Sequence, residues 1–202
     1  MQATGKHVTR SIVYEEFLAL QELSDLVRYT RARQAEFRAS QVHDPDHARD
    51  SYRRSRVLMD LGRFHDLFSQ RIAFYLHHIL RGLQHPFFEM ARLESQITAS
   101  NDGDYFHIHN DNTHANWPTR EITFVYFFHR EPCPFTGGEL VLYDFSPNGD
   151  STDTGAARKR VTPRQNSIVF FQSSILHEIL PVHCPSRRFD DSRFTLNGWL
   201  HR

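Results

Sequence analysis

Two stretches in the first half of the chain space their apolar residues as an amphipathic helix does. In residues 13–37, starting from Val13 and Phe17, apolar side chains recur at steps of three and four. The same spacing returns over residues 61–80. Because an α-helix completes a turn in about 3.6 residues, these steps gather the apolar side chains on one face. We therefore predict two helices, each buried along one side.

A polar segment separates the two predicted helices. Residues 41–54 include the charged run HDPDHARDSYRR, which predicts a mobile surface loop. The apolar residues that follow it predict a short strand over residues 56–59.

After Pro86 the pattern changes to short runs of β-type residues separated by turn signals. Turns are predicted at residues 101–103, 132–138, 146–149 and 184–192. Strands are predicted near residues 91–100, 105–109, 121–129, 139–143, 167–171, 178–183 and 193–200. Short strands at this spacing are typical of an all-β barrel or sandwich. Residues 146–164 form a long polar connection, and loops of that size often serve a site.

The size and composition of the chain predict one folded domain. Its 202 residues are 39% hydrophobic and 24% charged, far from the composition of disordered chains. We expect a single domain over residues 1–202, with a mostly helical part at 1–86 and a β core at 87–202. Lys plus Arg and Asp plus Glu number 24 each, so net charge provides no general attraction to nucleic acid or to an anionic membrane.

Three further features bear on the cellular compartment. No apolar run approaches the ~18 residues of a membrane span, and residues 1–11 lack the pattern of a signal peptide. The two cysteines, Cys133 and Cys184, cannot form a disulfide framework, which favours a reducing compartment. We expect a cytoplasmic protein with neither a nucleic-acid partner nor a membrane partner.

Side chains that bind metals are concentrated in the segment DYFHIHNDN. On a predicted strand His109 and Asp111 share one face, with Tyr105 and His107 further along it. This pair supplies two ligands of the two-histidine, one-carboxylate triad that holds non-haem Fe(II). His177 follows a later apolar strand, which a jelly roll brings beside the earlier one, so it is the candidate third ligand. His107 stays open between a supporting role and an ordinary strand histidine.

The last predicted strand carries a candidate anion-binding residue. Arg193 shares its face with Thr195, Asn197 and Trp199. A guanidinium that faces an apolar interior is costly unless it meets a carboxylate, which its planar fork suits. We therefore expect an anion inside the barrel.

Five motifs in consistent order resemble a known family. They are the run at residues 103–111, REITFVYFFH from Arg120, FTGGELVLYD from Phe135, HEILPV from His177 and RFTLNGW from Arg193. Together they resemble the prolyl 4-hydroxylase-like branch of the Fe(II)/2-oxoglutarate-dependent dioxygenases, over roughly the second half of the chain. The resemblance implies a mainly β fold with a double-stranded β-helix (jelly-roll) core and N-terminal α-helices packed on one sheet.

The resemblance also implies a reaction and its residues. It makes His109, Asp111 and His177 the catalytic metal ligands, and Arg193 the partner of the distal carboxylate of 2-oxoglutarate. The implied cofactors are Fe(II), 2-oxoglutarate as cosubstrate and O2, with ascorbate as a further candidate. The implied activity is hydroxylation of an unactivated C–H in a prolyl or amino-acid-type substrate, peptidyl or small-molecule, with release of succinate and CO2. The carboxylate of Asp111 favours hydroxylation, because related halogenases leave that position empty for chloride.

Two positions depart from the pattern of this branch. Ser100 and Phe127 stand where members often carry tyrosines that hydrogen-bond the cosubstrate. The candidate replacements are Gln96, Thr98, Tyr105 and Thr123. Tyr105 and Thr123 are favoured, because their positions along the predicted strands place them on the inward face. Thr195 completes the set of expected cofactor-binding residues. Arg187 is an alternative cosubstrate anchor, but Arg193 is preferred because Arg187 falls in a loop of Pro, Ser and Asp.

Two other functions compete with the hydroxylase. A non-catalytic jelly-roll module could bind a metal, such as zinc, for ligand recognition, although Asp111 and Arg193 count against it. A zinc hydrolase is disfavoured because no HExxH helix is present. The loops at 41–54 and 146–164 are expected to help form the mouth of the site, and their Arg and Asp content suits a polar, zwitterionic or acidic substrate. No oligomeric state is predicted.

Overall fold

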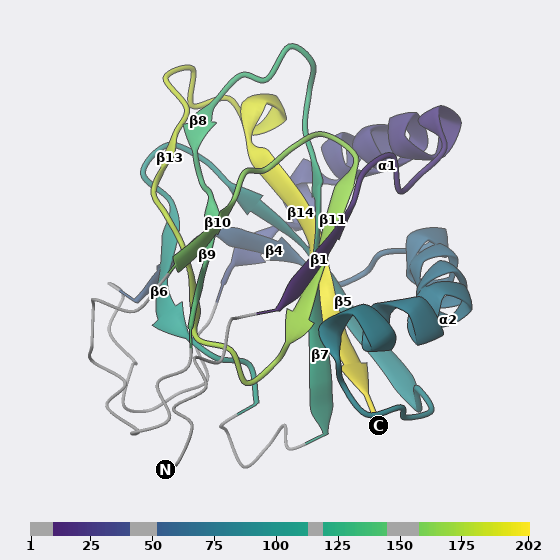
Figure 1. The fold of residues 1–202 in the computed structure, drawn as a ribbon. Coiled ribbons are helices and arrows are strands. Elements are labelled where there is room, and N and C mark those ends of the chain that lie inside the picture. Colours follow the sequence, from purple (N-terminus) through teal and green to yellow (C-terminus); the bar gives the residue numbers. More distant parts are fainter. Residues whose placement is uncertain (1–9, 41–51, 113–118, 145–157) are drawn as a thin grey trace.

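Two β-sheets face each other, and two helices cover the outer side of the larger sheet (Figure 1). This computed structural model describes residues 10–40, 52–112, 119–144 and 158–202. The predicted mainly β fold, a double-stranded β-helix with N-terminal helices packed on one sheet, is confirmed. No helix within these ranges has the length and apolar character needed to span a bilayer.

All strand pairs are antiparallel. The seven-stranded sheet runs in the order β1 (Ser11–Tyr14), β11 (Ser167–Gln172), β7 (Arg120–Phe128), β14 (Arg193–His201), β5 (Arg92–Ser100), β4 (Arg56–Leu58) and β2 (Arg38–Ala39). The five-stranded sheet runs in the order β10 (Arg158–Val161), β9 (Leu140–Tyr143), β12 (His177–Ile179), β6 (Tyr105–His109) and β3 (Arg53–Arg54). A separate pair joins β13 (Val182–His183) and β8 (Thr136–Gly137).

The seven-stranded sheet separates two apolar cores, because alternate residues of a strand face opposite sides of the sheet. On β7, Phe124 and Tyr126 belong to the core shared with the helices, whereas Val125 and Phe127 belong to the core between the sheets. The inner core is filled mainly by aliphatic and aromatic side chains of β7, β9 and β11. The remaining space between the sheets is therefore left to polar residues.

The helix predicted over residues 61–80 is confirmed as α2 (Arg63–Leu83). Its buried residues follow the predicted spacing, and the Phe68 ring lies 5.1 Å from the Tyr126 ring on β7, centroid to centroid. Two short 3-10 turns, η1 (Gln34–Glu36) and η3 (Phe189–Asp191), complete the helical elements of the described residues.

The helix predicted over residues 13–37 is wrong in its first part. Val13 lies on β1, which pairs with β11 at the sheet edge, and α1 spans only Leu20–Ala32. The side chain of Asn166 bonds both the N–H and the C=O of Leu18, which holds this connection in a non-helical path. Apolar spacing alone cannot distinguish an edge strand followed by a turn from the first turns of a helix.

Several short strands lie where loops or turns were predicted. β3 closes the expected loop at 41–54, β10 lies in the expected loop at 146–164, and β8 lies in the turn predicted at 132–138. The strand expected at 178–183 is divided into β12 and β13, while the other predicted strands are present within a few residues. The remainder of the two expected loops, at 41–51 and 145–157, lies outside the described residues.

Candidate metal centre

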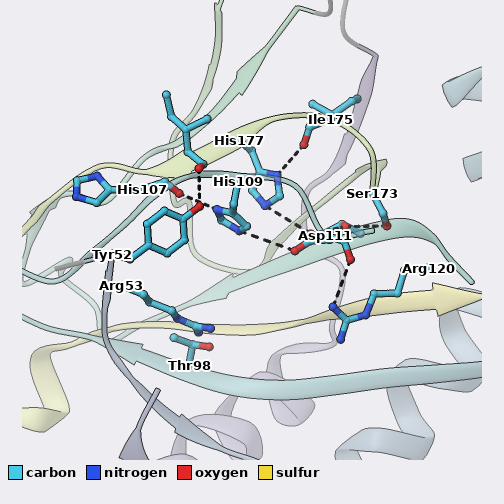
Figure 2. Close-up of polar contacts among 12 residues, drawn as sticks. Tyr52, Arg53, Thr98, His107, His109, Asp111, Arg120, Ser173, Ile175 and His177 are labelled. Atoms are coloured by element: carbon cyan, nitrogen blue, oxygen red, sulfur yellow. Dashed lines mark hydrogen bonds and ion pairs between the residues drawn. The ribbon is translucent and has the colours of Figure 1, made fainter. Parts of the chain in front are cut away.

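Adjacent strands of the five-stranded sheet bring the three predicted ligands together (Figure 2). His177 on β12 is the direct cross-strand partner of His109 on β6. Asp111 follows β6, and its N–H donates to the C=O of Ser173 at 2.9 Å. One nitrogen or oxygen atom from each of the three side chains lies within 4.8 Å of the others. The side chains are nearly buried, with 11%, 9% and 6% exposed for His109, Asp111 and His177.

Backbone carbonyls fix the orientation of both imidazoles. Nδ1 of His109 lies 2.7 Å from the C=O of His107, and Nδ1 of His177 lies 2.9 Å from the C=O of Ile175. A carbonyl only accepts hydrogen bonds, so each Nδ1 carries the proton and each Nε2 keeps its lone pair. The two Nε2 atoms lie 3.8 Å and 3.5 Å from carboxylate oxygens of Asp111. Metal-binding histidines are commonly oriented in this way.

The ionisation of the cluster suits a cation. Burial and the neighbouring His177 lower the pKa of His109 to about 3, which keeps its imidazole neutral and able to donate a lone pair. Burial acts to raise the pKa of Asp111, but His177, His109 and a hydrogen bond from Thr123 together hold it below its ordinary value. Two imidazoles and one carboxylate form a donor set that fits Fe(II).

Two hydroxyl groups support the carboxylate. Thr123 Oγ1 donates to Asp111 Oδ2 at 2.7 Å, and Thr123 Oγ1 lies 3.0 Å from Ser173 Oγ. Thr123 was predicted to contact a cosubstrate, and the structure places it in the cavity but with its hydroxyl bonded to Asp111. Its direct effect is therefore on the orientation of this candidate ligand.

Arg193 points into the cavity that the three candidate ligands line. The residue is 2% exposed, and its Nε and Nη2 atoms have no hydrogen-bond partner within the described part of the chain. Its guanidinium lies 5.1 Å from the centre of the Phe127 ring, and Gly138 lies against its stem, where a Cβ atom would be 2.5 Å from Cδ. Burial lowers the pKa of Arg193 to about 10, so the group stays cationic at neutral pH. An unpaired buried cation of this kind fits an anionic ligand.

The other residues expected to bind the cosubstrate also line this cavity. They are Tyr105, Thr195, Gln96 and Thr98, and Ser100, which stands where members of this branch often carry a tyrosine, lines the cavity too. The hydroxyls of Thr98 and Thr195 both donate to Asn197 Oδ1, at 2.9 Å and 3.1 Å. Arg187 does not line the cavity: its side chain is 79% exposed and its Nε pairs with Asp102 at 3.1 Å. His107 was predicted to share a face with His109, but it is exposed and does not line the cavity, because the pairing of β6 with β12 shifts in register before His109.

Two arginines that the sequence did not single out lie at the site. Arg120 places its guanidinium 3.6 Å from the centre of the Trp199 ring, and its Nη2 pairs with Glu94 at 2.5 Å. Arg53 on β3 lines the cavity beside His109 and Asp111. The sequence placed Arg53 in a charged loop, and a two-residue strand carries no periodicity that would have corrected this.

Comparisons with known proteins agree with this geometry. Residues 95–201 match the family model of the 2OG-Fe(II) oxygenase superfamily. An uncharacterized PKHD-type hydroxylase from Synechocystis sp. is 43% identical over 155 residues, which cover 76% of this chain and 51% of the relative. The chain therefore spans about half the length of the curated relative that it matches.

Solved structures with the same fold include two prolyl hydroxylases. A prolyl-4-hydroxylase from Pseudomonas putida aligns with a TM-score of 0.66 at 20% identity, covering 96% of this chain and 94% of its own. A prolyl hydroxylase from Trichoplax adhaerens, in complex with a hypoxia inducible factor peptide fragment, aligns with a TM-score of 0.68 at 15% identity, covering 96% and 84%. At these identities the likeness establishes the fold.

Proposed function

Because the chain belongs to the 2OG-Fe(II) oxygenase superfamily, we propose that it is an Fe(II)- and 2-oxoglutarate-dependent hydroxylase. Members of the superfamily use Fe(II), 2-oxoglutarate and O2. In the proposed reaction one atom of O2 replaces C–H by C–OH in the substrate. The other atom enters succinate as 2-oxoglutarate loses CO2. One domain carries this activity, because strands from residues 1–86 pair within both the seven-stranded sheet and the five-stranded sheet.

The observation that carries the proposal is the convergence of three ligand atoms beside an unpaired buried guanidinium. His109, Asp111 and His177 would hold Fe(II), and Arg193 would bind the distal carboxylate of 2-oxoglutarate. The iron supplies the activation of dioxygen for attack on an unreactive C–H bond. The protein supplies the fixed positions of these groups in one cavity between the two sheets.

Each neighbouring side chain has a separate task in this proposal. Thr123 holds the Asp111 carboxylate through its hydroxyl, which also contacts the Ser173 hydroxyl, and the Ser173 C=O accepts from the Asp111 N–H. Tyr105 and Thr195 line the space in which the cosubstrate would lie, and they would contact it there. The Arg120–Glu94 ion pair packs Arg120 on Trp199, which fixes one wall of the cavity.

The proposed substrate is a prolyl or amino-acid-type molecule, either peptidyl or small. Two of the structures that share the fold are named prolyl hydroxylases, and one of them holds a peptide. The curated relative is named a hydroxylase, which supports the same reaction type.

Succinate release tests the proposal. The wild-type chain, given Fe(II), O2, ascorbate and 2-oxoglutarate, is expected to form succinate slowly alone and faster with candidate substrates. His177→Ala and Arg193→Gln should abolish this signal, whereas Arg187→Gln, outside the cavity, should retain it. Failure of the wild type to form succinate under any of these conditions, together with metal-independent ligand binding, would instead support a non-catalytic binding module.

A further inference from the structure

Arg53 is held rigidly at the edge of the candidate metal centre. Its strand β3 pairs with β6, with Arg53 opposite Phe106. The N–H of His107 donates to the C=O of Tyr52 at 3.0 Å, and the Tyr52 hydroxyl donates to the C=O of Ile108 at 2.6 Å. These bonds fix the backbone before Arg53 to the strand that carries His109. The position of Arg53 is therefore tied to that of the candidate metal ligand.

The side chain of Arg53 lies beside His109, at the edge of the candidate metal position (Figure 2). Its guanidinium lies 4.7 Å from the centre of the Phe106 ring, and the Phe106 ring stacks on the His109 ring with centroids 3.5 Å apart. Arg53 Nε donates to Ser55 Oγ at 3.0 Å. No carboxylate forms an ion pair with Arg53 among the residues that the structure describes. Its two outer nitrogens are thus available to a ligand.

The charges in the cavity do not balance without a further anion. The lining residues include two guanidinium groups, Arg53 and Arg193, and one carboxylate, Asp111. Bound Fe(II) would add two positive charges and 2-oxoglutarate two negative ones, which leaves one positive charge uncompensated. Arg193 is buried and Arg53 is half-buried, and a charge withdrawn from water without a partner is costly, so such a site favours a ligand of opposite charge. Arg193 would be occupied by the cosubstrate, whereas Arg53 would not.

We propose that Arg53 binds a carboxylate of the primary substrate, and that the substrate is an amino acid whose carboxylate is free. The planar fork of Arg53 suits the two oxygens of a carboxylate. The carboxylate belongs either to a free amino acid or to the C-terminal residue of a peptide. This inference rests on the proposed function, because it assigns the substrate of the same site.

Binding to the loaded protein tests the assignment directly. The probes are the common L-amino acids, their C-terminal amides and the corresponding Gly-X dipeptides. Each is titrated calorimetrically into protein that holds Mn(II) in place of Fe(II) and saturating 2-oxoglutarate. At least one acid should bind, and its amide should bind roughly 10- to 100-fold more weakly, as expected for loss of a charge-assisted hydrogen bond. Comparison of free amino acids with dipeptides identifies the source of the carboxylate.

Variants of β3 connect the effect to Arg53. Arg53→Gln should weaken binding of the acid by the same roughly 10- to 100-fold and abolish the difference between acid and amide. Arg53→Lys should recover part of the affinity, because a point charge replaces the fork. The matched control is Arg54→Gln, since Arg54 is the next residue on the strand, is 65% exposed and pairs with Asp104 at 3.0 Å. This control should bind the acid as the wild type does, and thermal melting should show all variants folded.

Three results would overturn the inference. They are equal binding of acid and amide, no binding of any acid or dipeptide at millimolar concentration, and a loss confined to 2-oxoglutarate affinity in Arg53→Gln. In each case the wild-type protein still binds 2-oxoglutarate with Mn(II), so the proposed function survives. Failure of the wild type to bind 2-oxoglutarate would be the failure of the proposed function itself.

Discussion

Replacing Arg193 by Met should stabilise the protein without cosubstrate and destabilise it, relative to the wild type, when cosubstrate is present. Burial lowers the pKa of Arg193 to about 10, well below its ordinary value. The charged form is therefore disfavoured in the folded state at every pH below about 10, including neutral pH. One pKa unit corresponds to ~1.4 kcal/mol, so burial of this charge costs about 3 kcal/mol.

Met keeps most of the side-chain volume and removes the charge and its unpaired donors. The free energy of unfolding of Arg193→Met should therefore exceed that of the wild type by about 1–3 kcal/mol in the absence of 2-oxoglutarate. At a 2-oxoglutarate concentration of about 1,000 Kd the wild type gains ~4.1 kcal/mol, whereas the variant gains almost nothing. The order of stability should thus reverse.

Urea denaturation with Mn(II) present throughout, with and without 2-oxoglutarate, measures both differences. Arg187→Met is the control, since Arg187 is 79% exposed and should change the free energy of unfolding by less than ~0.5 kcal/mol in either condition. If Arg193→Met is less stable than the wild type without 2-oxoglutarate, burial of the Arg193 charge does not carry the expected cost. If 2-oxoglutarate stabilises both proteins to the same extent, Arg193 does not bind it.

Three other perturbations test individual parts of the site. Thr123→Val removes the hydrogen bond to Asp111 and should lower the affinity for Mn(II) roughly 10- to 100-fold in a chelator competition. The control Thr98→Val loses a bond to Asn197 instead and should change this affinity less than ~2-fold. Gly138→Ala places a Cβ atom 2.5 Å from Arg193 Cδ at a positive φ of 69°, so the Kd for 2-oxoglutarate should rise by at least ~10-fold; an unchanged Kd would contradict this packing. Removal of metal by EDTA should lower the melting temperature of the wild type but not that of His177→Ala, and equal shifts would exclude His177 as a ligand.

The sequence predicted those parts of the fold in which local pattern and long-range pairing agree. The apolar spacing of α2 matches the face that it buries. Strict alternation along β6 was wrong: it put His107 on the face of His109, whereas Phe106 and His109 line the cavity because the pairing of β6 with β12 shifts in register between them. The family motifs added the third ligand, His177, which no local pattern connects to His109. The structure shows that connection as a direct cross-strand pair.

The elements that were missed depend on partners far along the chain. β1 is an edge strand because β11 pairs with it, and its apolar residues alone resemble the start of a helix. β3 has two residues, so Arg53 enters the site only through pairing with β6. The hydrogen bond from Thr123 to Asp111 could not be predicted either, because strand parity gives the face of a side chain and not its hydrogen-bond partner; the contact of Thr123 with the cosubstrate stays a prediction.

The metal-to-chain ratio measures whether the three side chains together hold one iron ion. Anaerobic titration of the apoprotein with Fe(II) in the presence of 2-oxoglutarate should reach one iron per chain for the wild type. His109→Ala, Asp111→Ala and His177→Ala should each lose this binding. His107→Ala should keep it, because His107 is exposed and supports His109 only through its backbone C=O. Full iron binding by His177→Ala, or none by the wild type, would contradict the account.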